Sequence, residues 1–158
     1  MPITAYAAVD PDVQGINIHR TYSSSTKPTT TQVEAALEDG YREINARLSA
    51  LGYTMPFTST TSQSYKILKL INAYFAAAQA EMFAASFGGP AEAMRGQALL
   101  KEYERRMALI EDGSQTLIDA TEGRETPAQR NEQTPVGTFN LDSNDDERDS
   151  VFTRDMKF

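Results

Sequence analysis

The chain has 158 residues, of which 22 are acidic and 15 basic, so its net charge is −7. Its length favours one domain. The absence of cysteine excludes a disulfide framework, a thiolate metal site and a cysteine nucleophile. An acidic chain is also poorly suited to nucleic acid, because neutralising phosphates requires clustered Lys and Arg. The first residues lack a basic segment followed by an apolar stretch, so we expect no signal peptide.

Residues 1–28 are expected to form an irregular N-terminal arm with room for one short helix. Asp10 and Pro11 have the residue types of a helix N-cap and of a first helical position. The polar run that follows, from Ser23 to Lys27, is unsuited to a core. We therefore place residues 1–28 outside the main domain, which we assign to residues 29–120.

The first long helix is predicted to begin just after Pro28 and to stop at Gly52. Thr31 and Glu34 have the spacing of a capping box, in which each residue satisfies a free backbone amide of the other. Apolar residues then recur at steps of three and four, which indicates one buried helical face. These residues are Val33, Leu37, Tyr41, Ile44, Leu48 and Leu51.

A second helix is predicted from about Ser64 to Phe87, ended by Gly88-Gly89-Pro90. We expect its main stripe to consist of Tyr65, Leu68, Ile71, Asn72, Phe75, Gln79, Met82 and Phe83. Alanines make its other faces apolar as well, and such a helix is usually covered on several sides. Its polar interruptions favour a buried helix over a membrane span.

A third helix is predicted from about Ala91 to Asp112, with Gly113 as its break and one or two further turns within residues 114–120. Its expected inner face comprises Met94, Ala98, Tyr103, Met107 and Ile110. The predicted fold class is therefore all-α, a small bundle of three main helices. A bundle of about 90 residues is marginal alone, so we expect neighbouring chains to stabilise it.

Residues 121–158 are predicted to be a long extended C-terminal tail. They hold nine acidic and five basic side chains, which is −4 of the total charge. Spaced apolar residues make the tail unlike a purely disordered spacer. The candidate contacts with a neighbouring chain are Phe139, Leu141, Phe152, Met156 and Phe158. The alternative is that these side chains fold back onto their own bundle.

No pattern in the sequence indicates catalysis, a cofactor or a metal. His19 has no partner at a defined spacing, which favours a structural or surface role. The chain lacks a G-x-S-x-G elbow and a phosphate-binding glycine loop. The acidic run after Asp142 begins like a calcium loop, but Glu147 replaces the required glycine and Thr153 the final glutamate. We therefore expect no enzyme.

One stretch resembles the opening of the head–tail connector proteins of long-tailed bacteriophages, also called adaptor or head-completion proteins. In that family a "KP-[ST]-x-x-x-V" helix start is followed by a helix ending in "L-x-x-x-G-Y", then by an alanine-rich helix and a charged one. The same order occurs here, and the resemblance covers about residues 1–113. It is carried by Ser25 to Leu37, Ile44 to Leu48, Leu51-Gly52-Tyr53 and Pro56.

The resemblance implies a structural protein of the virion that is assembled in the host cytoplasm. Family members form helical bundles that assemble into a ring, commonly twelvefold, beneath the portal protein. Tail segments reach into neighbouring subunits and the portal, and the ring docks stopper or tail proteins. Viral DNA passes through the ring without sequence-specific binding, and an acidic lumen would repel its phosphates. The resemblance implies no role for a membrane.

Three other interpretations compete with the connector on the residues alone. A generic acidic helical binding module, such as an assembly chaperone or scaffold, explains the charge and the helices equally well. A small enzyme with a carboxylate site is disfavoured, because the chain has no Glu-x-x-His pair for a metal-binding bundle. A stopper or tail-terminator protein is disfavoured because such proteins tend to be β-rich.

Overall fold

The structure, a computed structural model, describes residues 4–118. Within that range the secondary structure is helical, with no β-strand. Along the chain the elements are η1 (Val9–Val13), α1 (Gln14–Ile16), α2 (Thr30–Ala50), α3 (Gln63–Gly88) and α4 (Pro90–Glu111). The expected all-α class is confirmed for this part of the chain. None of its helices is long and apolar enough to cross a bilayer.

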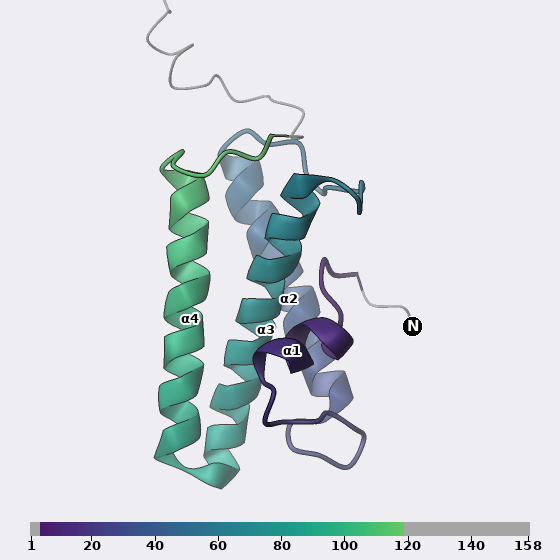
Figure 1. Ribbon diagram of the computed structural model, residues 1–158, viewed down its shortest axis with the longest axis vertical. Helices are drawn as coiled ribbons and strands as arrows, with labels where there is room; N and C mark the ends of the chain where they lie inside the picture. Colours follow the sequence, from purple (N-terminus) through teal and green to yellow (C-terminus); the bar gives the residue numbers. More distant parts are fainter. Residues whose placement is uncertain (1–3, 119–158) are drawn as a thin grey trace, which may run out of the picture. The chain divides into compact units, whose positions relative to one another are not determined.

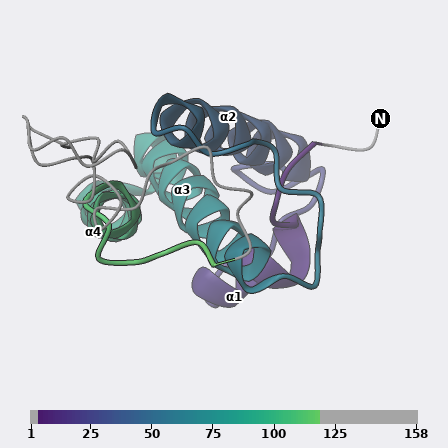
Figure 2. The ribbon, with the colours of Figure 1, turned by 90° about the horizontal axis from the view of Figure 1, so that it is seen from above.

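Helix α3 is the centre of the described fold. It contacts α2, α4 and the short η1–α1 segment, which lie on different sides of it (Figures 1 and 2). The prediction that an alanine-rich, apolar helix is covered on several sides is therefore confirmed. The elements that cover it in this structure belong to the same chain.

The start of α2 differs by two residues from the predicted capping box. Thr29 is the N-cap, and its extended backbone (φ −78°, ψ 160°) lets its hydroxyl accept from the Gln32 amide at 3.3 Å. The Gln32 side chain accepts from the Thr29 amide at 2.8 Å, which completes the box. Thr31 is already inside the helix, so the Thr31–Glu34 box is wrong.

Helix α2 packs on α3 through Val33, Leu37, Ile44 and Leu48, all fully buried as predicted. Gly40 permits the close approach of the two helices, because an added Cβ would lie 2.6 Å from Phe75 Cδ1. Tyr41 and Leu51 are only partly buried. The predicted stop is confirmed: α2 ends at Ala50, and Gly52 has a φ of 89°.

The predicted stripe of α3 is correct in its first half and wrong in its second. Leu68, Ile71, Asn72 and Phe75 are buried, and Tyr65 packs on the core from its edge. Beyond them, alanines and Glu81 replace the larger residues as the buried face, because three different elements press on the helix. Gln79 and Met82 are half-buried, and Phe83 is 37% exposed.

Helix α4 is rotated from its predicted orientation near its start. Tyr103, Met107 and Ile110 are buried as expected, but Ala98 is exposed and Met94 is 71% exposed. The cause is Gly96, which packs against α3 so closely that a Cβ would lie 3.0 Å from the Met82 backbone nitrogen. Gly89, at a φ of 111°, and Pro90 separate α3 from α4 as predicted.

The N-terminal arm is part of the core, which corrects its expected place outside the bundle. The Asn72 side-chain oxygen accepts the amides of Tyr6 and Ala7 at 3.1 and 3.2 Å. Its amide nitrogen donates to the Leu37 carbonyl at 3.0 Å, so one residue of α3 joins the arm to α2. Val13 is completely buried beside the alanines of α3.

The short helix predicted at Asp10-Pro11 is present as η1 and α1, and the Asp10 backbone is extended there (φ −120°, ψ 129°), as expected of a residue before a first helical proline. The Ala8 amide donates to Asp12 at 2.9 Å. Asp12 also pairs with Lys69 of α3 at 2.9 Å, which holds the arm further. After α4 the chain forms no further helical turn within residues 113–118, where Leu117 closes the core and Ile118 is exposed.

Candidate functional site

A buried carboxylate lies between the arm, α3 and α4. Glu81 is 0% exposed, and Arg20 of the arm donates to both of its oxygens, from Nε at 2.7 Å and from Nη2 at 3.3 Å. His19 Nε2 lies 3.0 Å from the same oxygen as Arg20 Nε. The pKa of Arg20 is raised, first of all by its hydrogen bond to Glu81.

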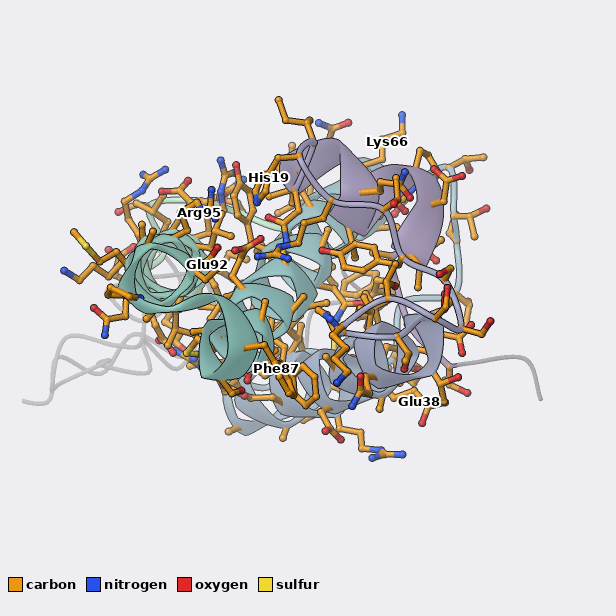
Figure 3. All side chains as sticks on the ribbon, turned by 90° about the horizontal axis from the view of Figure 1, so that it is seen from below. His19, Glu38, Lys66, Phe87, Glu92 and Arg95 are labelled. Atoms are coloured by element: carbon orange, nitrogen blue, oxygen red, sulfur yellow. The ribbon has the colours of Figure 1, made fainter. Side chains whose placement is uncertain are left out.

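Helix α4 completes this cluster with Arg95 and Glu92. Arg95 Nε is 3.5 Å from Glu81, and Arg95 Nη2 is 3.3 Å from Glu92. Glu92 also lies 3.8 Å from Arg20. His19, Glu92 and Arg95 meet on the same side of the molecule (Figure 3). With a neutral imidazole, two arginines balance two glutamates, so the burial of Glu81 is compensated.

The chemistry open to the Glu81 cluster is limited. Both oxygens of Glu81 are held by arginine, which leaves it poorly suited to accept a substrate proton. No group of three or more metal-ligating side chains occurs within residues 4–118. Asn17, another buried polar residue of the arm, donates to the Ala77 carbonyl at 3.2 Å and thereby fixes the arm beside the cluster. This arrangement is that of a structural anchor.

An apolar groove lies between the first half of α2 and the second half of α3. It encloses about 360 Å³. Its lining contains no charged residue and consists of Pro28, Gln32, Val33, Ala35, Ala36, Gln79, Ala80 and Phe83. In a chain with 23% charged residues, an uncharged surface hollow of this kind is a candidate docking surface.

Phe87 stands next to this groove, one helical turn beyond Phe83. Its side chain is 61% exposed, and its ring centroid is 5.6 Å from that of Phe83. The Lys27 ammonium lies 4.5 Å from the centre of the Phe87 ring. Phe87 lies beside α2, away from His19 and Arg95 (Figure 3). The groove and the Glu81 cluster are thus separate features of α3.

A second charged network joins α4 to α2 at the other end of the bundle. Arg47 of α2 binds Glu111 at 2.7 Å and Glu104 at 3.0 Å, and its pKa is raised, chiefly by the Glu111 hydrogen bond. The Tyr103 hydroxyl donates to Glu43 at 2.9 Å. Burial, and then this hydrogen bond, raises the Tyr103 pKa.

Glu102 of α4 also forms ion pairs with arginines. It pairs with Arg105 and Arg106, each at 2.7 Å. The hydrogen bond from Arg105 is the largest cause that lowers the Glu102 pKa to about 2. These pairs join residues of one helix at helical spacing and so support α4 locally. Arg106 also lies over the Tyr74 ring of α3, 4.9 Å from its centre.

The predicted contact residues of the tail lie outside the residues that the structure describes. They are Phe139, Leu141, Phe152, Met156 and Phe158, and the acidic run after Asp142 lies outside as well. Sequence reasoning missed both the Glu81 cluster and the groove beside Phe87. The signals available to it were a lone acid in an alanine-rich helix, at Glu81, and two phenylalanines four residues apart near the end of that helix.

Comparison with known proteins gives no relative. No family model, no curated protein and no solved structure matches this chain.

Proposed function

We propose that this chain is a non-enzymatic structural protein of a tailed bacteriophage, a subunit of the ring that connects the portal vertex of the head to the tail. The observation that carries the proposal is the ordered resemblance from Ser25 to Pro56 and through the two helices that follow. That stretch corresponds to the α2 N-cap, α2 itself and the turn at Gly52.

Two features of the described residues support a structural role. The fully buried carboxylate, Glu81, is occupied by Arg20 and Arg95 and so is not free for acid–base chemistry. Its partners come from the arm and from α4, so its charge fixes the position of those elements. Long-range electrostatics adds a third argument, because a chain of net charge −7 repels DNA phosphates and would let DNA pass through a channel.

In this proposal the chain forms a ring, commonly twelvefold in the resembled family, and binds the portal on one side and a stopper or tail protein on the other. The extended tail reaches the neighbouring subunit or the portal through Phe139, Leu141, Phe152, Met156 and Phe158. Its location would be the head–tail interface of the virion, after assembly in the host cytoplasm.

The test is the mass of the full chain, alone and mixed with phage portal assemblies, by native mass spectrometry or light scattering. A ring, or a chain that joins the portal in ring stoichiometry, would support the proposal. Truncation after Ala120 should leave the helices folded, as judged by circular dichroism, and abolish portal binding. Portal binding that survives this truncation would remove the tail from the mechanism.

The alternative is an acidic helical module that binds another protein, such as an assembly chaperone or scaffold. The uncharged groove between α2 and α3 is the specific observation in its favour, because a client segment could occupy it. A chain that ignores portals but binds capsid or tail components during assembly would favour this alternative.

A further inference from the structure

The groove between α2 and α3 and the phenylalanine beside it form a surface that can fit itself. Phe83 lines the groove, and Phe87 projects one turn further along the same helix with 61% of its surface exposed. A hollow and a projecting ring on one face are the two halves of a self-complementary contact. Across a twofold axis, the ring of each copy meets the hollow of the other.

The two ends of the groove carry charges of opposite sign. Lys27 lies at the end where α3 finishes, against the Phe87 ring. On α2 the groove-lining row of Gln32, Ala35 and Ala36 continues at helical spacing to Asp39, whose side chain is 66% exposed and accepts from Arg42 at 3.0 Å. Arg42 also pairs with Glu38 at 3.2 Å, so these three side chains together carry one negative charge. Seven residues of helix place Asp39 about 10 Å beyond Gln32 along the axis of α2.

The neighbouring Gly40 confirms which end Asp39 occupies. An added Gly40 Cβ would touch Phe75 and Asn72, which lie about two to four turns before Phe83 and Phe87 on α3. The groove therefore has a cation, Lys27, at one end and the net negative group of Glu38, Asp39 and Arg42 at the other. When two copies meet with their grooves antiparallel, Lys27 of each copy faces Asp39 of the other.

Charge repulsion opposes self-association less at this face than over the rest of the surface. Each copy carries a net charge of −7, so two copies repel each other at most relative orientations. None of the eight residues that line the groove is charged, which lets two copies approach here without that repulsion and removes exposed aromatic surface from water.

We propose that this face is a twofold self-association interface, in which Phe87 of each copy enters the groove of the other and Lys27 pairs with Asp39 across the axis. A contact of this symmetry closes on itself, so it yields a dimer and no larger assembly. It does not depend on the connector role, since a ring of subunits requires two different surfaces on each copy.

The experiment measures the mass of the full chain, without portal, by sedimentation velocity from about 1 to 200 µM. We expect a monomer–dimer equilibrium. The Phe87→Ser variant should weaken it at least about tenfold, because a buried aromatic anchor is lost. The matched control is Met94→Ser, which changes a similarly exposed apolar residue on α4 (71% exposed) and should leave the equilibrium unchanged.

A charge exchange tests the antiparallel arrangement. Lys27→Glu and Asp39→Lys should each weaken the dimer, and the double variant should restore it, because the pair is re-formed with its signs reversed. A chain that stays monomeric over the whole range would overturn the proposal. So would a dimer that tolerates Phe87→Ser, or a double variant weaker than both single ones.

The outcome is separable from the connector proposal. Portal binding in the mixed sample tests the connector, and the mass without portal tests the interface. A monomer that joins the portal in ring stoichiometry overturns only the interface. A dimer sensitive to Phe87→Ser that ignores the portal overturns only the connector.

Discussion

Single residues decide which surface of α3 the arm covers. Asn72 and Glu81 are fully buried polar residues in a helix that otherwise buries alanines and large apolar side chains. Each would cost free energy if its partners were lost, because a buried polar group without a hydrogen bond is strongly disfavoured. The partners that satisfy them come mainly from residues 6–20, so these two residues specify where the arm lies.

The first prediction concerns the ion pair of Glu81. Arg20→Met should lower the free energy of unfolding by about 3 kcal/mol, because it leaves a buried carboxylate with weaker partners. The measurement is urea unfolding followed by circular dichroism. Arg42→Met is the matched control, since Arg42 is 68% exposed and its ion pairs within residues 4–118 are with Glu38 and Asp39 on the surface. It should cost less than about 1 kcal/mol.

A second variant separates the charge from the packing. In Arg20→Met combined with Glu81→Met, the uncompensated buried charge is gone, and part of the lost stability should return. Equal losses for Arg20→Met and Arg42→Met would show that the Glu81 pair contributes no more than an exposed one.

The Glu81 cluster could not be predicted from the sequence, because its members are distant along the chain. Glu81 and His19 are separated by 62 positions, and no local pattern pairs them. The local sequence around His19 argued only against catalysis, because a lone histidine without nearby partners favours a structural role. The three-dimensional contact with Glu81 explains what that role is.

Among the helices, start and stop positions were easier to predict than orientation. Gly52 and Gly88-Gly89-Pro90 act through local backbone geometry, and the helices end there as expected. The buried face of α4 was predicted wrongly only near its start, because Gly96, a small residue with no signal of its own, packs there against Met82 of another helix. The buried face of α3 beyond Phe75 was missed for a similar reason: alanine looks neutral until a neighbouring element approaches it closely.

The second prediction tests how the arm is attached to the helices. Asn72→Leu removes the acceptor for the amides of Tyr6 and Ala7 while keeping the size of the side chain. We expect these two amides to exchange with solvent at least about tenfold faster, because each loses its hydrogen-bond partner in the closed state. The measurement is hydrogen exchange by mass spectrometry or NMR.

The control for this variant is Gln97→Leu, which makes the same kind of change at an exposed position of α4. It should leave the exchange of the arm unchanged. If Asn72→Leu accelerates exchange equally in the arm and in α2, α3 and α4, the residue supports global stability and is not a specific attachment of the arm.

Considered as a whole, the described fold is three helices and an arm held by two kinds of contact. Apolar packing on α3 forms the core, and charged or hydroxyl groups join elements that α3 does not bring into wide contact. Arg47 and Tyr103 connect α2 to α4 in this way, with Glu43, Glu104 and Glu111 as partners. The sequence predicted the helices and their order, but it placed the arm outside the core because an irregular polar segment gives no periodic signal.

The last prediction concerns Tyr6 and Tyr103, two buried tyrosines whose hydroxyls form hydrogen bonds with α2. Burial raises the pKa values of Tyr6 and Tyr103, and for Tyr103 the hydrogen bond to Glu43 raises it further. In the unfolded chain both hydroxyls should titrate near their ordinary pKa of about 10. Above that pH the unfolded state releases protons that the folded state retains, so the stability should fall as pH rises, by up to about 1.4 kcal/mol per pH unit for each tyrosine.

The measurement is the free energy of unfolding in urea at several values between about pH 8 and pH 11. The chain has no tryptophan, so tyrosinate absorbance can be followed without interference. Tyr103→Phe removes one of the two groups and should make the dependence on pH shallower. The variant is also less stable at neutral pH, because Glu43 loses the Tyr103 donor and keeps only the longer contact with Arg47 among those within residues 4–118. Tyr103 is completely buried in the core with Met107, and its ring packs against that of Phe75, so its hydroxyl should resist ionisation while the core stays closed. An unchanged slope in this variant would contradict the prediction, because it would mean that Tyr103 ionises as readily in the folded protein as in the unfolded chain.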